Sequence, residues 1–341
     1  MNQTTALIAS AAVVISSATT ELMRRYALRR NLLDVPNARS SHAVPTPRGG
    51  GVGIVVAFFV TALVLAMTGQ IGARLLAALL LGGGMTALIG FLDDRRPQPA
   101  RIRFLVHACA AVCAVMLIGS MPDRVLLHWG LQVAWIGFVL TVIAVVWVTN
   151  LFNFMDGIDG IAAAEAVFVA GAGAAFNACY GGDSGLTAAF LCLAGASLGF
   201  LFRNWPPAKI FMGDVGSGFV GFMLAALGLA ASQPGTFPIE VWIILGGAFF
   251  VDATLTLIMR IARGERWYEA HRSHAYQRLA RRWNAHLPVT LLLTIINLFW
   301  LLPWAICAAS YPARASLSLA AALLPLAAAV VACNATRESP T

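Results

Sequence analysis

The chain alternates long apolar runs with short polar connections. Spanning a bilayer takes roughly 20 residues, and eleven runs are long enough to span or nearly span one. They lie near 4–23, 50–68, 72–91, 103–120, 131–149, 160–180, 185–202, 216–232, 239–260, 288–309 and 313–333. This pattern predicts an all-α, polytopic integral membrane protein with about eleven transmembrane helices and a single domain over residues 1–341.

Composition supports the same class. Of the 341 residues, 59% are hydrophobic and 11% are charged, and the mean hydropathy is +0.78. A soluble core does not need so many apolar positions. The net charge of +8 indicates basic cytoplasmic loops on a membrane protein, not nucleic-acid binding. The six cysteines lie in apolar runs without a C-x-x-C pair, so we expect neither disulfides nor a zinc site.

The basic residues are distributed unevenly between alternate loops. With the N-terminus outside, only Arg74, Arg124 and Arg314 of the 23 Lys and Arg residues face outward. This predicts a periplasmic N-terminus and, after an odd number of spans, a cytoplasmic C-terminus. No positive residue precedes the first apolar run, so we expect an anchor and not a signal peptide. The polar motifs fall in inner loops 24–49, 92–103, 149–160, 203–217 and 261–287.

A polar ladder lies at the end of the run 131–149. Its members recur every third residue: Asn150, Asn153, Asp156 and Asp159. Residues three apart share nearly one helix face, and Gly157 and Gly160 then allow close approach to a ligand. A polar helix end at the headgroup level is the alternative. Two amides and two carboxylates without a local Lys or Arg favour a functional site, whose cation comes from another loop or a metal.

Three further aspartates suggest a metal. Adjacent Asp93 and Asp94 repel each other unless a cation lies near them, and their hard oxygens suit Mg²⁺ or Mn²⁺. Neutralisation by the neighbouring Arg95 and Arg96 is the alternative. Asp214 lies between glycines at a predicted helix start. Helix capping alone would explain Asp214 and Ser217, but it does not explain why Gly213, Gly216 and Gly218 occur together.

Several residues are candidates for substrate binding. Arg48 precedes a glycine-rich helix start, a combination that favours an anion site or a lipid-headgroup contact. Phe211 offers an aromatic face for a base, beside Lys209, the single lysine of the chain. The last inner loop holds a cationic cluster suited to a diphosphate, with a headgroup patch or a zinc pair as alternatives: His271, Arg272 and His274. Glu165 and Asp252 are expected to pair with loop arginines.

Six motifs then occur in order between residues 34 and 279: D-V-P-N-A-R-S-S-H, P-T-P-R-G-G-G, F-L-D-D, N-L-F-N-F-M-D-G-I-D-G, I-F-M-G-D-V-G-S and H-R-S-H. With these motifs the chain resembles the polyprenyl-phosphate N-acetylhexosamine-1-phosphate transferases. The resemblance implies a Mg²⁺-dependent enzyme with an eleven-helix fold. It would transfer a sugar 1-phosphate from a UDP-sugar to undecaprenyl phosphate and release UMP.

The resemblance also implies roles for the residues above. Asp93, Asp94 and Asp156 would be catalytic, and Asp214 would hold the metal with Asp93 and Asp94. The remaining candidates would bind substrate: Arg48, Asn150, Asn153, Asp159, Lys209, Phe211, His271, Arg272 and His274. One departure is Pro97, which stands where the family often has a third acidic or polar residue.

The final loop, H-R-S-H-A-Y-Q-R-L, resembles the branch that starts O-antigen or similar surface glycans. The expected location is therefore the bacterial inner membrane, with the active site facing the cytoplasm. Membrane lipids are expected partners and nucleic acid is not. The sequence does not decide whether the protein forms a homodimer. A transporter is the alternative function, because intramembrane acids also mark ion pathways.

Overall fold

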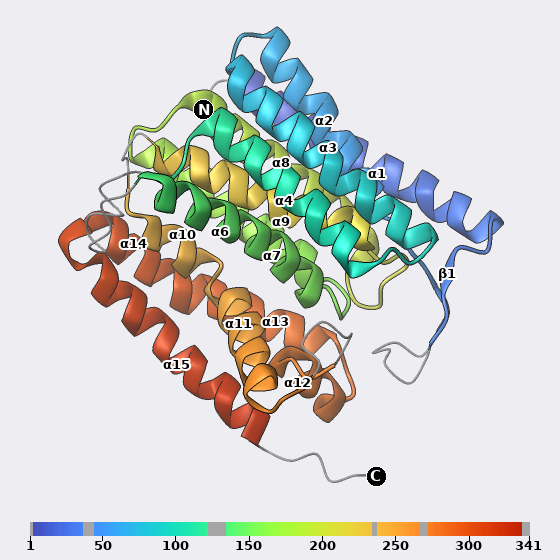
Figure 1. The fold of residues 1–341 in the computed structure, drawn as a ribbon. Coiled ribbons are helices and arrows are strands. Elements are labelled where there is room, and N and C mark those ends of the chain that lie inside the picture. Colours follow the sequence, from blue (N-terminus) through green and yellow to red (C-terminus); the bar gives the residue numbers. More distant parts are fainter. Residues whose placement is uncertain (1–2, 37–43, 122–133, 234–236, 266–271, 336–341) are drawn as a thin grey trace.

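The computed structural model describes residues 3–36, 44–121, 134–233, 237–265 and 272–335. Within them the chain is almost entirely helical, which confirms the all-α prediction. The strands are β1 (Leu33–Asp34) and β2 (Thr46–Pro47), which pair antiparallel before the second helix. Figure 1 shows the helices gathered into one bundle.

The helices follow one another with short connections. In the first part of the chain they are α1 (Gln3–Arg29), α2 (Val52–Met67), α3 (Ala73–Arg95), α4 (Ala100–Ile118), α6 (Ala134–Met155), α7 (Ile161–Cys179), α8 (Ser184–Asn204) and α9 (Asp214–Ser232). In the second part they are α10 (Ile239–Leu245), α11 (Gly247–Ala262), α12 (Ala275–Trp283), α13 (Leu287–Ile296), the π-helix η1 (Asn297–Leu301), α14 (Leu302–Ser310), the 3₁₀ turn η2 (Pro312–Arg314) and α15 (Ala315–Ala335).

Every predicted span contains helix, but two differ from the expected straight crossing. Nine helices of the described chain are long and apolar enough to span a membrane, which makes the protein polytopic. Helix α2 has only 16 residues. The run 239–260 is broken into α10 and α11, bent by 79°, with Gly246 between them. Counted as one span, this pair makes ten.

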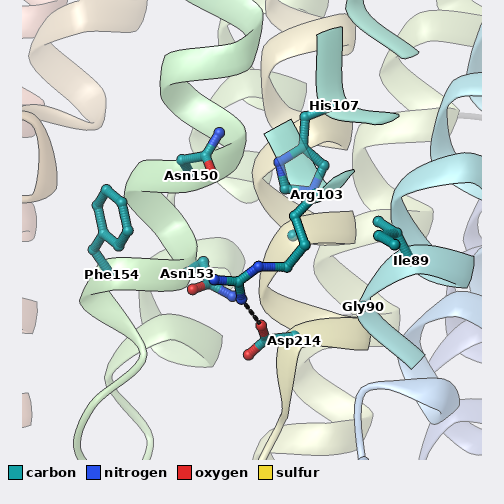
Figure 2. Close-up of a pocket in the computed structure, with 9 residues that line it drawn as sticks. Ile89, Gly90, Arg103, His107, Asn150, Asn153, Phe154 and Asp214 are labelled. Atoms are coloured by element: carbon teal, nitrogen blue, oxygen red, sulfur yellow. Dashed lines mark hydrogen bonds and ion pairs between the residues drawn. The ribbon is translucent and has the colours of Figure 1, made fainter. Parts of the chain in front are cut away.

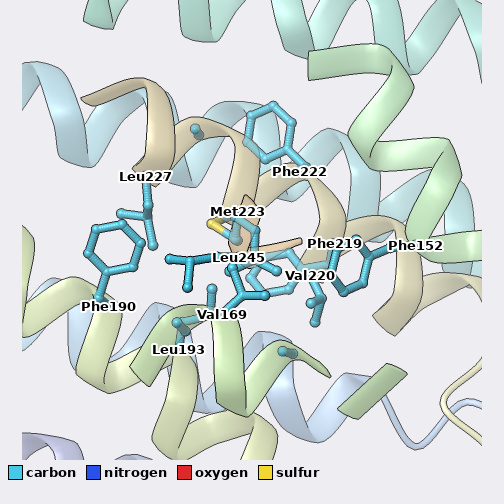
Figure 3. Packing of buried hydrophobic residues seen from close by; sticks show 14 of the residues in the cluster. Phe152, Val169, Phe190, Leu193, Phe219, Val220, Phe222, Met223, Leu227 and Leu245 are labelled. Atoms are coloured by element: carbon cyan, nitrogen blue, oxygen red, sulfur yellow. The ribbon is translucent and has the colours of Figure 1, made fainter. Parts of the chain in front are cut away.

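Helix α9 lies at the centre of the bundle. In its most apolar window 89% of the residues are buried, and its Phe219, Phe222 and Met223 fill the space between neighbouring helices (Figure 3). Glycines on α3 make this packing possible: a Cβ at Gly82 would lie 2.1 Å from the Phe222 ring. Because α9 is packed so tightly, its N-terminal end is a rigid platform for polar groups.

Helices α10 to α15 pack beside this core (Figure 1). Asn297, at the start of the π-helix, donates a hydrogen bond to buried Glu165 on α7. On α11, the Asp252 carboxylate accepts hydrogen bonds from the backbone N–H groups of Ala275 and Tyr276, both at 3.0 Å. Both buried acids therefore tie helices together. The expectation that they pair with loop arginines was wrong for the part of the chain described.

Candidate active site

Asp94 joins the end of α3 to the start of α9. Its carboxylate accepts hydrogen bonds from the backbone N–H groups of Asp214 at 3.0 Å and Val215 at 3.1 Å. These are N–H groups that a helix start leaves unpaired. Gly213 allows this approach, since it has φ +74° and a Cβ there would lie 2.5 Å from Asp94 Oδ2. The glycine before Asp214 is thus required by the cap.

Arg48 completes the environment of Asp94. Its guanidinium lies 2.7 Å from Asp94 Oδ1. Burial disfavours the charged guanidinium, but the neighbouring carboxylates, Asp94 foremost, outweigh this effect and raise the pKa of Arg48. The backbone amides expected to bind an anion here are already used, because Gly50 N–H donates to Phe211 O and Gly51 N–H donates to Met212 O, both at 2.9 Å. Anion binding at this loop therefore depends on Arg48 itself.

Arg103, at the start of α4, is the cation that the acidic residues require. It lies 3.0 Å from Asp93 Oδ2 and 2.8 Å from Asp214 Oδ2, and so bridges the two carboxylates. Figure 2 shows its contact with Asp214. Arg95 instead lies over the Phe91 ring, 4.3 Å from its centroid. The sequence did not single out Arg103. The short connection between two predicted spans was the signal, because it returns α4 beside the end of α3.

The two amides of the polar ladder face α4 and α9. Asn153 donates a hydrogen bond to Ser217 Oγ at 3.1 Å, and Asn150 donates to the Val146 carbonyl at 2.7 Å. With Arg103 and His107 they line a pocket next to Asp214 (Figure 2). His107 is a second residue that the sequence did not single out, and its buried Nδ1 has no hydrogen-bond partner in the described structure.

Asp156 begins the turn after α6 and is half-buried. Within the described residues its carboxyl group makes no hydrogen bond or ion pair. Burial, together with the negative charges of Asp214, Asp94 and Asp159, raises its pKa well above the ordinary value. The Asp156 carboxyl group is therefore close to other carboxylates and has no hydrogen-bond or ion-pair partner of its own within the described residues.

Asp159 differs from Asp156, although the two belong to one ladder in sequence. Its carboxylate accepts a hydrogen bond from Ala208 N–H at 2.9 Å and lies 3.1 Å from His286 Nδ1. The helix ends at Met155, so the three-residue spacing no longer places these two acids on one face. One is available to a ligand and the other holds loops together.

The remaining candidates lie in different places. Phe211 is half-buried on the loop before α9, while the side chain of Lys209 is exposed. Arg272 is exposed and His274 is buried, 3.3 Å from Asp252 and stacked on the Tyr276 ring. His271 lies outside the described residues. The structure therefore does not bring His274 and Arg272 together as one cationic surface.

The acidic groups can be tested for their fit to a divalent metal. No group of three or more His, Cys, Asp or Glu in the described chain is arranged to hold an ion. Asp93 and Asp214 nevertheless share one cation, the Arg103 guanidinium, and their carboxylate oxygens are ligands that Mg²⁺ prefers. This pair fits a metal. Asp93 also accepts a hydrogen bond from the Gln98 backbone N–H at 2.6 Å. Asp94 is less suited still, because Arg48 and two backbone N–H groups already use its oxygens.

Comparisons with known proteins indicate one family. The family model described as glycosyl transferase family 4 matches residues 75–232. The chain is 32% identical over 285 residues to the probable undecaprenyl-phosphate N-acetylglucosaminyl 1-phosphate transferase of Bacillus subtilis (strain 168), covering 82% of this chain and 78% of that protein.

Mycobacterial proteins are similar over the same extent. The decaprenyl-phosphate N-acetylglucosaminephosphotransferase of Mycobacterium leprae (strain TN) is 30% identical over 323 residues, which is 84% of this chain and 80% of that protein. The protein of the same name from Mycolicibacterium smegmatis (strain ATCC 700084 / mc(2)155) is 30% identical over 325 residues. Similarity over most of both chains, together with the matched family model, identifies the family. The chain belongs to the polyprenyl-phosphate N-acetylhexosamine-1-phosphate transferases of glycosyl transferase family 4.

Proposed function

We propose that this protein transfers an N-acetylhexosamine 1-phosphate from a UDP-sugar to undecaprenyl phosphate and releases UMP. N-acetylglucosamine is the first sugar to test, because the names of the relatives specify it. The observation that carries the proposal is the meeting of Asp93, Asp94 and Asp214 with Arg48 and Arg103 at one end of the helix bundle. Such a site can hold several phosphate oxygens next to the membrane.

The reaction joins two anions. A phosphate oxygen of the lipid attacks the β-phosphorus of the donor, and the bond from that phosphorus to the bridging oxygen of UMP breaks. Asp93 and Asp214 would hold a Mg²⁺ ion, with Mn²⁺ as a substitute, which neutralises charge on the diphosphate when bound. Asp94 would take part by fixing the start of α9, where Asp214 stands.

The arginines and Asp156 have distinct roles in this scheme. Arg48 and Arg103 would stabilise negative charge on the transferring phosphoryl oxygens. A phosphate monoester has its second pKa at about 6, so most of the acceptor is already ionised near neutral pH. Asp156, whose pKa is raised by burial and neighbouring acids, would take the residual proton.

The donor's nucleotide would lie between the end of α6 and the loop before α9. Asn150 and Asn153 offer amides there, and Phe211 offers an aromatic face for the base. Contacts of Lys209, His271, Arg272 and His274 with the donor stay predictions. The buried place of His274 favours an indirect role through α12.

The glycan and the location are also part of the proposal. The final loop resembles the O-antigen-initiating branch, so we infer a surface-glycan pathway starting at the cytoplasmic face of the bacterial inner membrane. A transporter is less well supported, because the clustered carboxylates lie at the ends of α3 and α9 and not at their midpoints. Self-association into a homodimer stays a prediction.

A product assay tests the function. The purified protein in nanodiscs is given undecaprenyl phosphate, Mg²⁺ and one of several UDP-N-acetylhexosamines, and the lipid product is analysed by mass spectrometry. We expect a lipid heavier by one N-acetylhexosamine phosphate, together with UMP. If no donor gives this lipid, or if UDP is released instead, the proposed function is wrong.

A further inference from the structure

The turn after α6 is tied to two other parts of the chain. Gly160, which has φ +76°, donates its N–H to Asn204 Oδ1 at 3.0 Å, and Asn204 Nδ2 donates to the Ile210 carbonyl at 3.0 Å. Ala208 N–H donates to the Asp159 carboxylate at 2.9 Å. These bonds join the turn 156–160 to the loop 203–213, which leads into Asp214.

The second of these parts is the start of α13. His286 Nδ1 lies 3.1 Å from Asp159 Oδ1 and 3.4 Å from the Asp159 backbone nitrogen. With a proton on Nδ1 the ring donates to the carboxylate, and without it the ring accepts from the backbone N–H. His286 thus contacts Asp159 in either tautomer. One turn later, Thr290 Oγ1 donates to the Asp159 carbonyl at 2.9 Å.

This contact is largely shielded from water. The side chains of His286 and Asp159 are 15% and 12% exposed. Hydrogen bonds in such surroundings hold geometry more firmly than exposed ones do. Asp156, three residues before Asp159, donates its backbone N–H to the Asn153 carbonyl at 3.4 Å, but its carboxyl group makes no hydrogen bond in the described chain. The direction of this side chain therefore depends on the backbone of the turn.

We propose that His286 is a positioning residue, which acts through Asp159 to set the turn that carries Asp156 and borders the nucleotide of the donor. This inference rests on the proposed function for its kinetic consequence, but the structural consequence is independent of it. Losing a hydrogen bond to a charged partner should raise the KM for the UDP-sugar by about tenfold. The KM for undecaprenyl phosphate should not change.

The test compares three variants with the parent protein. His286→Leu removes both contacts, and His286→Asn keeps a donor and an acceptor near the place of Nδ1. Thr294→Val is the matched control, because Thr294 Oγ1 bonds only to the Thr290 carbonyl within α13. Both KM values are measured, and amide hydrogen exchange is followed at residues 156–161 and 204–211.

We expect His286→Leu to raise only the KM for the UDP-sugar and to speed exchange in these two segments. His286→Asn should restore both, and Thr294→Val should resemble the parent. Unchanged exchange in His286→Leu, an equal rise in both KM values, or failure of His286→Asn to restore them would overturn the proposal. If the parent protein transfers no sugar phosphate at all, the proposed function is refuted, while the exchange data still decide the positioning role.

Discussion

Four aspartates of the site differ in their hydrogen bonds and ion pairs, although their side chains are chemically identical. Asp94 caps α9 and pairs with Arg48, whereas Asp93 and Asp214 share Arg103. The carboxyl group of Asp156 has no hydrogen-bond partner in the described chain. These contacts distinguish aspartates that position other groups from those that would contact the substrate. Each role can be tested by a single substitution.

The first prediction concerns Asp214. Asp214→Asn keeps the size of the side chain but removes a charge that would hold the metal, so turnover should fall by at least about a hundredfold. Thermal stability should stay close to that of the parent. Asp183→Asn is the matched control, because Asp183 also begins a helix but lies at the start of α8, away from the site. Normal turnover in Asp214→Asn would reject its assignment.

The second prediction concerns stability and pH. The pKa of Asp156 is raised in the folded protein, so the folded state binds more protons than the unfolded state between the ordinary pKa of about 4 and the raised value. Stability therefore falls as pH rises through that window. Asp156→Asn should remove this loss.

The measurement for Asp156 is the melting temperature from about pH 4 to pH 8, with a chelator present. We expect Asp156→Asn to melt at a higher temperature than the parent at neutral pH, and at a similar temperature at the acidic end, where Asp156 is neutral. A variant that is less stable than the parent at neutral pH would show that the carboxylate is favourably placed.

At the level of single residues, the sequence located acids better than cations. Asp93 and Asp94 were predicted because carboxylates beside apolar runs are costly without a role. Asp214 was predicted from the resemblance to the family. Arg103 and His286 were not, because each meets its acidic partner only after separate helices have packed. His274 belongs to the polar motif H-R-S-H, yet it is buried against Asp252. Sequence spacing alone cannot distinguish a residue that contacts substrate from one that makes such a buried contact within the protein.

Among the elements, the junction of α3 with α9 controls the site. Gly213 has φ +74°, and a Cβ there would lie 2.5 Å from the Asp94 carboxylate. Gly213→Ala should therefore move Asp94 from the cap and lower activity by at least about tenfold, since strained conformations of this kind cost about 1–3 kcal/mol.

The control for Gly213→Ala is Gly84→Ala. Gly84 lies inside α3, and a Cβ there would meet no atom within 4 Å. Because alanine favours helices more than glycine does, this variant should keep activity and match or exceed the parent in stability. The comparison uses initial rates and melting temperatures. Equal activity in Gly213→Ala and the parent would contradict the role assigned to the cap.

The positions of the helices were predictable from apolar runs, and their interruptions were not. Composition alone does not reveal the bend of 79° between α10 and α11, because Ile239, Trp242 and Phe249 are as apolar as a straight span requires. The π-helix at Asn297 likewise comes from packing, where Asn297 meets Glu165 on α7. Such breaks depend on tertiary contacts that a hydropathy pattern does not contain.

For the whole molecule, the fourth prediction is its orientation. The basic residues place the N-terminus outside and the C-terminus inside the cytoplasmic membrane, with the loops around Asp93 and Asp214 facing the cytoplasm. Cysteine labelling or reporter fusions at the two ends should therefore report opposite sides. Accessibility of both ends from one side would contradict this topology.

Attack of the lipid phosphate on the donor's β-phosphorus can be followed with a phosphorus label. A UDP-N-acetylhexosamine labelled at the β-phosphorus is given to the protein with undecaprenyl phosphate, and the lipid and nucleotide products are separated. We expect the label to enter the lipid as a diphosphate-linked sugar, with unlabelled UMP as the leaving group. Label remaining in released UDP would mean attack at the sugar carbon and would rule out phosphoryl transfer by this protein.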